Sequence, residues 1–257
     1  MLEAIELTRD FGTHRALDAL TIRVSPGEVF CLLGANGAGK STTMKLFLGF
    51  LVPTSGKALI DGLDVTKEPV ASKRKVIYIP ELVSLYSDLS GMENLAYFSA
   101  LAGVENRDEA FFHDCLVRAG LSSAAVGRRA GTYSKGMRQK VGLALAYARQ
   151  AKALLLDEPT SGLDPQASVE FHEALCQQRE QGVAVLMATH DLFRAREVAD
   201  RIGIMRGGRL QRIVDAHTIS AVELESLYLE EMGYSRLSAT KTRASVPAND
   251  MPRSRTE

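Results

Sequence analysis

One eight-residue segment, Gly34-Ala35-Asn36-Gly37-Ala38-Gly39-Lys40-Ser41, constrains the fold of this chain more than any other feature. Two glycines are separated by four residues and followed by lysine and serine, which is the pattern of a phosphate-binding loop. The run before it, Val29 to Leu33, is continuously apolar, as in a strand buried on both faces. A helix is expected from Ser41 to about Phe50. In a strand–glycine turn–helix unit, the backbone N–H groups of the turn and of the first helical turn point at one anion. The segment therefore predicts an α/β fold with a phosphate site.

The same segment predicts the residues that bind a nucleotide. Lys40 would reach the β- and γ-phosphates, and the Ser41 hydroxyl would bind Mg²⁺. A chance glycine-rich turn is the alternative, but the position between a buried strand and a helix favours the phosphate loop. The residues predicted to bind nucleotide here are Gly34, Asn36, Gly37, Gly39, Lys40, Ser41 and Thr42.

Short alternating segments predict a small antiparallel sheet near the start of the chain. Apolar and polar residues alternate at 4–7 and 20–24, and a third strand candidate, 58–60, ends at the turn dipeptide Asp61-Gly62. A last hairpin is expected over residues 202–211, around Gly207 and Gly208.

The rest of the chain predicts an α/β core interrupted by helices. Strand-like runs at 153–156 and 183–187 flank a helical stretch at 168–180, which makes a β-α-β unit. From 84 to 149 the apolar residues fall at spacings of three and four, so this region is expected to be all helix. The expected domains are an α/β domain with the phosphate site (1–215, with core 1–83 and 150–215 and helical insertion 84–149) and a C-terminal helical extension with a flexible tail (216–257).

Two adjacent carboxylates, Asp157 and Glu158, follow the apolar run Leu154 to Leu156. Such a pair at the end of a buried strand is unfavourable unless a cation or a proton is present. A Mg²⁺ ion bound with the nucleotide would supply the cation. Asp157 is then predicted to hold the metal, directly or through water, and Glu158 to polarise the water that attacks the γ-phosphate. In isolation the pair could also cap a helix or end a strand.

Taken together, the motifs resemble the ATP-binding subunit of ABC transporters over about residues 2–215. The sequence of the signature segment, Tyr133-Ser134-Lys135-Gly136-Met137-Arg138-Gln139, is similar to that of the branch that serves ABC-2-type exporters. The resemblance implies an α/β protein with a P-loop NTPase (RecA-like) core, an N-terminal antiparallel β subdomain and an inserted α-helical signature subdomain. The segments that carry it are Gly34 to Ser41, Tyr133 to Met137, Leu156 to Asp164, and His190.

The resemblance implies roles for residues outside the phosphate loop. Phe11 would stack on adenine, although a core phenylalanine beside the first strand is the alternative. His190 would contact the γ-phosphate and orient the water and Glu158, with ATP and Mg²⁺ as the cofactors. Ser134 and Gly136 would contact the γ-phosphate of an ATP held by an opposite subunit.

A second ATP-binding subunit is therefore implied, either a further copy or a paralogue. Asp164 would communicate across the interface between the two, although it could be a simple turn residue before Pro165. Transmembrane permease subunits are the other implied partners. Their contact would lie in the groove near 82–101, where Leu85, Tyr86, Leu89, Tyr97 and Phe98 serve docking, core packing or both.

Two positions depart from the family pattern. Glu81 stands where most of the family has glutamine, and it is expected either to ligate the metal beside Ser41 and Asp157 or to tune the coupling differently. Lys135 and Met137 replace the commoner glycine and glutamine of the signature, which adds positive charge near the phosphates. The exporter branch tolerates these residues, so the enzyme is expected to be active.

Composition restricts the partners. With 31 basic and 31 acidic side chains the formal net charge is zero, which argues against a basic nucleic-acid binder, so no nucleic acid is expected. The longest apolar runs, 46–53 and 141–148, cover eight residues, far fewer than the roughly 20 of a membrane-spanning helix. The protein is expected in the cytoplasm, on the inner face of the cell membrane through its permease.

The sequence thus predicts an ATP-hydrolysing subunit that powers an exporter, with the transported substrate left open. The alternative is a soluble ABC ATPase that acts with non-membrane partners. A P-loop GTPase or small-molecule kinase would leave the segment Tyr133 to Met137 unexplained, and no Asn-Lys-x-Asp motif is present.

Overall fold

Residues 1–104 and 107–234 are described by the structure, a computed structural model. The elements along the chain are β1 (Leu2–Phe11), β2 (His14–Val24), β3 (Val29–Leu33), α1 (Lys40–Phe47), β4 (Ser55–Ile60), β5 (Leu63–Asp64), α2 (Pro69–Lys73), β6 (Val76–Ile79), α3 (Gly91–Leu101), α4 (Glu109–Arg118), α5 (Ser123–Val126), the 3₁₀ helix η1 (Ala130–Thr132), α6 (Lys135–Arg149), β7 (Ala153–Asp157), α7 (Pro165–Glu180), β8 (Ala184–Thr189), α8 (Leu192–Val198), β9 (Arg201–Arg206), β10 (Arg209–Asp215) and α9 (Ala221–Glu231).

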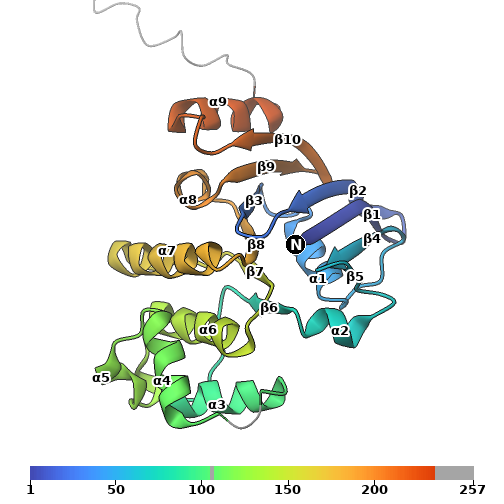
Figure 1. Cartoon of the computed structure of the whole chain (residues 1–257). Helices are drawn as coiled ribbons and strands as arrows, with labels where there is room; N and C mark the ends of the chain where they lie inside the picture. The colour runs from blue at the N-terminus through green and yellow to red at the C-terminus, as the bar shows by residue number, and fades with distance from the viewer. Residues whose placement is uncertain (105–106, 235–257) are drawn as a thin grey trace, which may run out of the picture.

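Two sheets organise the chain. The four-stranded sheet has the order β2-β1-β4-β5 with antiparallel pairing throughout. The six-stranded sheet has the order β10-β9-β3-β8-β7-β6; its strands are parallel except for β10, which pairs with β9 as an antiparallel hairpin. In Figure 1 the four-stranded sheet lies on one side of α1, and helices α7 and α8 lie on the opposite side of the six-stranded sheet.

The continuously apolar strand β3 is buried over its whole length because both of its faces are covered. Val29, Cys31 and Leu33 belong to a core shared with α6, α7 and α8, whereas Phe30 and Leu32 belong to a second core shared with α1 and the four-stranded sheet. Side chains of a strand alternate between faces, so one five-residue run supplies both cores.

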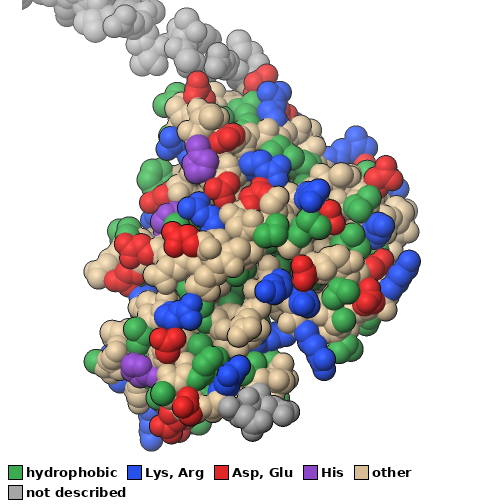
Figure 2. All heavy atoms as spheres, in the orientation of Figure 1, with side chains coloured by type: hydrophobic (Ala, Val, Ile, Leu, Met, Phe, Trp, Pro, Cys, Tyr) green, Lys and Arg blue, Asp and Glu red, His purple; other side chains and the backbone are tan. Residues whose placement is uncertain are grey.

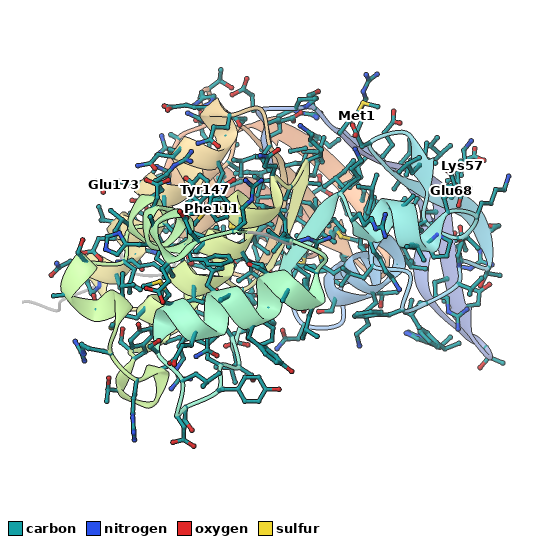
Figure 3. The ribbon with its side chains drawn as sticks, turned by 60° about the horizontal axis from the view of Figure 1, so that its bottom comes forward. Met1, Lys57, Glu68, Phe111, Tyr147 and Glu173 are labelled. Carbon is teal, nitrogen blue, oxygen red and sulfur yellow. The ribbon has the colours of Figure 1, made fainter. Side chains whose placement is uncertain are left out.

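Helices α3 to α6 follow β6 and precede β7 in the chain, and Figure 1 shows them gathered at one end of the molecule, away from α9. In Figure 3, Phe111 of α4 and Tyr147 of α6 lie close together in this helical part, and Lys57 and Glu68 lie at the far end of the molecule. On the face drawn in Figure 2, basic and acidic side chains are interspersed. Within the described residues, no helix has the length and apolar character needed to cross a membrane.

The α/β fold predicted from the sequence is confirmed, as are the antiparallel N-terminal strands, the β-α-β unit of β7, α7 and β8, and the last hairpin. A helix, α9, lies in the predicted C-terminal extension. Residues 235–257, predicted to be a flexible tail, lie outside the described residues. The domain boundaries at 84, 149 and 215 stay predictions.

Three helix predictions were wrong in extent. The helix expected to reach Phe50 ends at Phe47, because Gly49 adopts the left-handed conformation (φ 64°) that terminates helices. The region 84–149 is not all helix: residues 84–90 are irregular, and α3 begins only at Gly91, where Ser90 is the N-cap and forms a capping box with Glu93. Helix α7 begins at Pro165 rather than 168, with the Asp164 side chain as its N-cap.

Three elements were not predicted: α2, β6 and α8. Strand β6 covers only four residues before Pro80, too few for a periodic pattern. Yet β6 pairs with β7 in parallel and forms the edge of the six-stranded sheet. Its position brings the segment that follows it, including Glu81, beside the end of β7.

Candidate functional site

Four neighbouring strands lead, at their carboxyl ends, into many of the predicted site residues. The order β3-β8-β7-β6 is parallel throughout. Strand β3 leads into the loop 34–41, β8 ends before His190, β7 ends at Asp157, and β6 ends two residues before Glu81. Because the carboxyl ends of parallel strands meet at one edge of a sheet, segments far apart in sequence converge there, as in ligand sites of open α/β sheets.

The loop 34–41 curls tightly around its own lysine. Gly37 and Gly39 have positive φ angles of 80° and 107°, a region open to glycine without strain. The Lys40 ammonium donates to the carbonyl oxygens of Gly34 (2.6 Å) and Ala35 (3.2 Å). Burial lowers the pKa of Lys40, and the charges of Glu158 and Asp157 oppose that shift. The Lys40 ammonium is thus held at the start of α1. Because the helix dipole is positive at this end, both the lysine and the helix favour a bound anion here.

A cavity of about 290 Å³ opens beside this loop. Phe11 lines it and is 44% exposed, which is not the burial of a core phenylalanine. The guanidinium of Arg9 lies 4.6 Å from the centre of the Phe11 ring. The residues that line the cavity are Phe11, His14, Ala16, Asn36, Gly37, Ala38, Gly39, Lys40, Ser41 and Thr42.

Glu158 is fixed by its neighbours on β8. Its Oε2 accepts a hydrogen bond from the Thr189 hydroxyl (2.9 Å), and its Oε1 lies 2.8 Å from Nδ1 of His190. The backbone N–H of Glu158 donates to the Ala188 carbonyl, and its φ of 47° is unusual for a residue other than glycine. Strained backbone of this kind persists where the surroundings hold it, often at functional sites. The structure therefore brings together the predicted pair Glu158 and His190.

Asp157 lies in a less polar setting. Burial raises the pKa of its carboxyl group, and the charges of Glu158 and Glu81 add to that effect. The Tyr78 hydroxyl donates to Asp157 Oδ2 over 3.4 Å, and burial together with Asp157 raises the pKa of Tyr78 to about 12. The carboxylates at this edge thus repel one another, and a bound cation would relieve that repulsion.

Within the described ranges, no three His, Cys, Asp or Glu side chains are grouped so that they alone could hold a metal ion. A hard cation with only one or two protein carboxylates and remaining ligands from water and phosphate is the usual magnesium arrangement. Asp157 and the Ser41 hydroxyl fit that arrangement. Glu81 contributes charge to this edge, although the described contacts of its carboxylate are with Ser161 and Lys135.

Ser134, Gly136 and Asp164 lie at helix starts and do not line the cavity beside the loop 34–41. Ser134 is the N-cap of α6, and its hydroxyl accepts from the Met137 N–H. Asp164 is the N-cap of α7. A Cβ at Gly136 would lie 3.0 Å from the Ala167 Cβ, so this glycine lets the two helix starts approach each other.

Three residues of the site were missed by sequence reasoning. Thr189 holds Glu158, Tyr78 contacts Asp157, and His14 lines the cavity. Thr189 directly precedes His190 at the end of an apolar strand, which is a signal that could have identified it. Nothing in the sequence around Tyr78 or His14 distinguishes them from other residues of their type.

Comparison with protein-family models matches residues 17–161 to a model described as ABC transporter. The probable multidrug ABC transporter ATP-binding protein YbhF of Escherichia coli is 39% identical over 211 residues, which is 82% of this chain and 36% of that protein. The Nod factor export ATP-binding protein I of Rhizobium etli is 34% identical over 79% of this chain and 65% of its own. The chain thus spans about a third of the length of the first of these relatives.

Solved structures agree with this similarity. An ATP binding subunit of an ABC transporter is 30% identical, with a TM-score of 0.75, and the match covers 89% of this chain and 99% of that one. A dimeric post-hydrolysis state of the cassette MJ0796, bound to ADP and Pi, has a TM-score of 0.73 over 85% of this chain and 100% of its own. At 24% identity, the latter match concerns the fold alone.

The close packing around Gly34 predicts the effect of adding one methyl group at this position. A Cβ at Gly34 would lie 2.6 Å from the Met205 carbonyl oxygen and 2.9 Å from the Ala38 Cβ. Gly34→Ala should therefore lower the free energy of unfolding by about 1–3 kcal/mol, as measured by urea denaturation. Gly127→Ala is the matched control, because a Cβ there meets nothing within 4 Å and φ is −85°. A Gly34→Ala protein as stable as the control would contradict this description of the loop.

Proposed function

The chain belongs to the ABC transporter family, and we propose that it is the ATP-binding and ATP-hydrolysing subunit of an ABC-2-type exporter with separate transmembrane subunits. The observation that carries the proposal is the sheet edge where the phosphate loop lies next to Glu158, Thr189 and His190. One relative is named for Nod factor export, and others for multidrug and bacitracin transport, which supports export as the direction. The transported substrate stays open.

ATP would occupy the cavity beside the loop 34–41. The adenine would stack on the exposed ring of Phe11, and the phosphate oxygens would accept hydrogen bonds from the N–H groups at the start of α1. For this, the Lys40 ammonium would leave the carbonyl oxygens of Gly34 and Ala35 for the β- and γ-phosphates. The remaining residues proposed to contact nucleotide are Gly34, Asn36, Gly37, Gly39, Ser41 and Thr42, of which all but Gly34 line the cavity.

Mg²⁺ would be held by Ser41 and Asp157, with Glu81 as the third proposed ligand. Burial raises the pKa of Asp157, and the charges of Glu158 and Glu81 add to that effect; a bound cation would relieve the repulsion among these carboxylates. When bound with ATP, the ion would neutralise charge that develops on the phosphates.

Glu158 would act as the general base for the attacking water. The Thr189 hydroxyl fixes one carboxylate oxygen, and His190 contacts the other. His190 is 61% exposed at its side chain, so its ring can contact a γ-phosphate that enters from solvent. These contacts orient Glu158 toward the water that it would polarise.

A second ATP-binding subunit would complete the site. Ser134, Gly136 and Asp164 lie outside the nucleotide cavity of their own subunit, and the exposed Ser134 before α6 suits contact with the ATP of another. Head-to-tail pairing would enclose two nucleotides between two subunits.

Permease subunits are the proposed membrane partners of this member of the ABC transporter family. An apolar groove of about 290 Å³ follows the Glu81 segment, and Leu82 at its rim is 69% exposed. The nearby rings of Tyr86 and Tyr97 pack edge to face, 5.0 Å apart. We propose that a permease segment docks here, which would hold the chain on the cytoplasmic face of the membrane. The groove is lined by Leu82, Val83, Leu85, Leu95, Phe98 and Leu145, among others.

Glu158→Gln tests the general base. Loss of a positioned base should reduce ATP turnover at least about a hundredfold, while the amide keeps the shape of the side chain and ATP binding is retained. Steady-state phosphate release and equilibrium binding of ATP measure the two quantities separately. Glu173→Gln is a matched control on the exposed surface of α7. Turnover near that of the wild type would refute the assignment of Glu158.

Affinity purification tests the partner. Tagged Glu158→Gln protein is purified from detergent-solubilised cells in the presence of ATP and Mg²⁺, and the proteins that co-purify are identified by mass spectrometry. A polytopic membrane protein in stoichiometric amount is the expected result. Soluble partners alone would contradict the proposal and favour an ATPase that acts away from the membrane.

A further inference from the structure

Three segments of the chain meet at one oxygen of Glu81. The Ser161 hydroxyl donates to Glu81 Oε1 over 3.0 Å, and the Lys135 ammonium lies 3.5 Å from the same oxygen. Every described hydrogen bond and ion pair of this carboxylate uses Oε1. The carboxylate therefore joins the end of β6 to the start of α6 and to the segment that follows β7.

The backbone beside Glu81 is held by the same helix. Gln139, fully buried, donates through Nε2 to the carbonyl oxygens of Pro80 (3.1 Å) and Glu81 (3.0 Å). Lys135 and Gln139 are four residues apart, so they lie on one face of α6. One face of this helix therefore contacts both the backbone and the side chain of the Glu81 segment.

Lys135 also lies against the segment after β7. A Cβ at Gly162 would be 3.9 Å from the Lys135 ammonium. The lysine side chain is only 24% exposed, whereas the Glu81 side chain is 51% exposed. Lys135 is thus the more buried partner, and it lies between the two segments that flank the carboxylate.

The charges at this edge give the ion pair its significance. Glu81 lies close enough to Asp157 to raise the pKa of that carboxyl group, although burial is the main cause. Asp157 and Glu158 already place two carboxylates beside the phosphate loop. A third carboxylate without a counter-ion would repel an anionic ligand. Among the described ion pairs of Glu81, the only cation is Lys135.

We propose that Lys135 is a positioning residue for Glu81: it neutralises the carboxylate and, with Ser161, anchors it through Oε1, so that a third acid is compatible with nucleotide binding. This inference rests on the proposed function, because it concerns the same nucleotide site. It assigns Lys135 a role within its own subunit, toward Glu81, and not a direct contact with phosphate.

A double-mutant cycle tests the pair in the nucleotide-free protein. The variants are Lys135→Met, Glu81→Gln and the double variant, with Lys67→Met as a control in an exposed loop. Partly exposed ion pairs contribute up to about 1 kcal/mol, so the coupling should change the unfolding equilibrium constant by about two- to fivefold. Urea denaturation measures this coupling. Strictly additive effects of the two substitutions would show that Lys135 and Glu81 do not interact.

ADP binding in the presence of EDTA tests the role at the site. Lys135→Met should weaken ADP binding by about two- to fivefold in the Glu81 protein, because an uncompensated carboxylate repels the phosphates. In the Glu81→Gln background the same substitution should have little effect, and Lys135→Arg should restore wild-type affinity. The effect should also shrink at 1 M salt, where the Debye length is about 3 Å.

An equal loss of affinity in both backgrounds would overturn the proposal, because it would mean that Lys135 acts on the nucleotide without Glu81. A wild-type protein that binds no ADP or ATP would refute the proposed function instead. The urea cycle needs no nucleotide, so it would still report on the pair. The two failures are therefore distinguishable.

Discussion

Repulsion among carboxylates at one edge of a parallel sheet is the constraint on which the rest of this structure depends. Asp157 and Glu158 end β7, Glu81 follows β6, and burial raises the pKa of Asp157. The surrounding residues respond to that charge: Thr189 donates to Glu158, Tyr78 donates to Asp157, and Lys135 pairs with Glu81. The Lys40 ammonium lies across its own loop, where a phosphate can take over its contacts. The proposed function has this edge receive a cation together with an anion.

The fold supplies this edge by burying β3 between two cores. The core on one face contains α1, which directs its N-terminus at the site, and the core on the other contains α6 and α7. The starts of α6 and α7 are capped by Ser134 and Asp164 and lie outside the cavity beside the loop 34–41. One subunit therefore carries a nucleotide cavity and, apart from it, the surface proposed to complete the cavity of a second subunit.

Most of this site could be predicted from the sequence, because its residues follow apolar strands or begin helices. Such positions converge in space whenever the strands are parallel, so the loop 34–41, Asp157 and His190 could be grouped without coordinates. Strand β6 could not be found, since four residues give no period. The contacts of Glu81 with Lys135 and Ser161 link residues 54 and 80 positions apart, and no local pattern reveals such a pair. The end of α1 was missed because Gly49, not loss of apolar character, ends the helix.

The central claim is that one chain carries an incomplete site which a second subunit closes around ATP. The most direct measurement is the molar mass of Glu158→Gln protein by light scattering after size exclusion, with and without ATP and Mg²⁺. The account predicts a monomer without nucleotide and, for two identical chains, twice that mass with ATP; with a paralogue, the doubling would require adding that chain. A protein that binds ATP and stays monomeric with every candidate partner would contradict it.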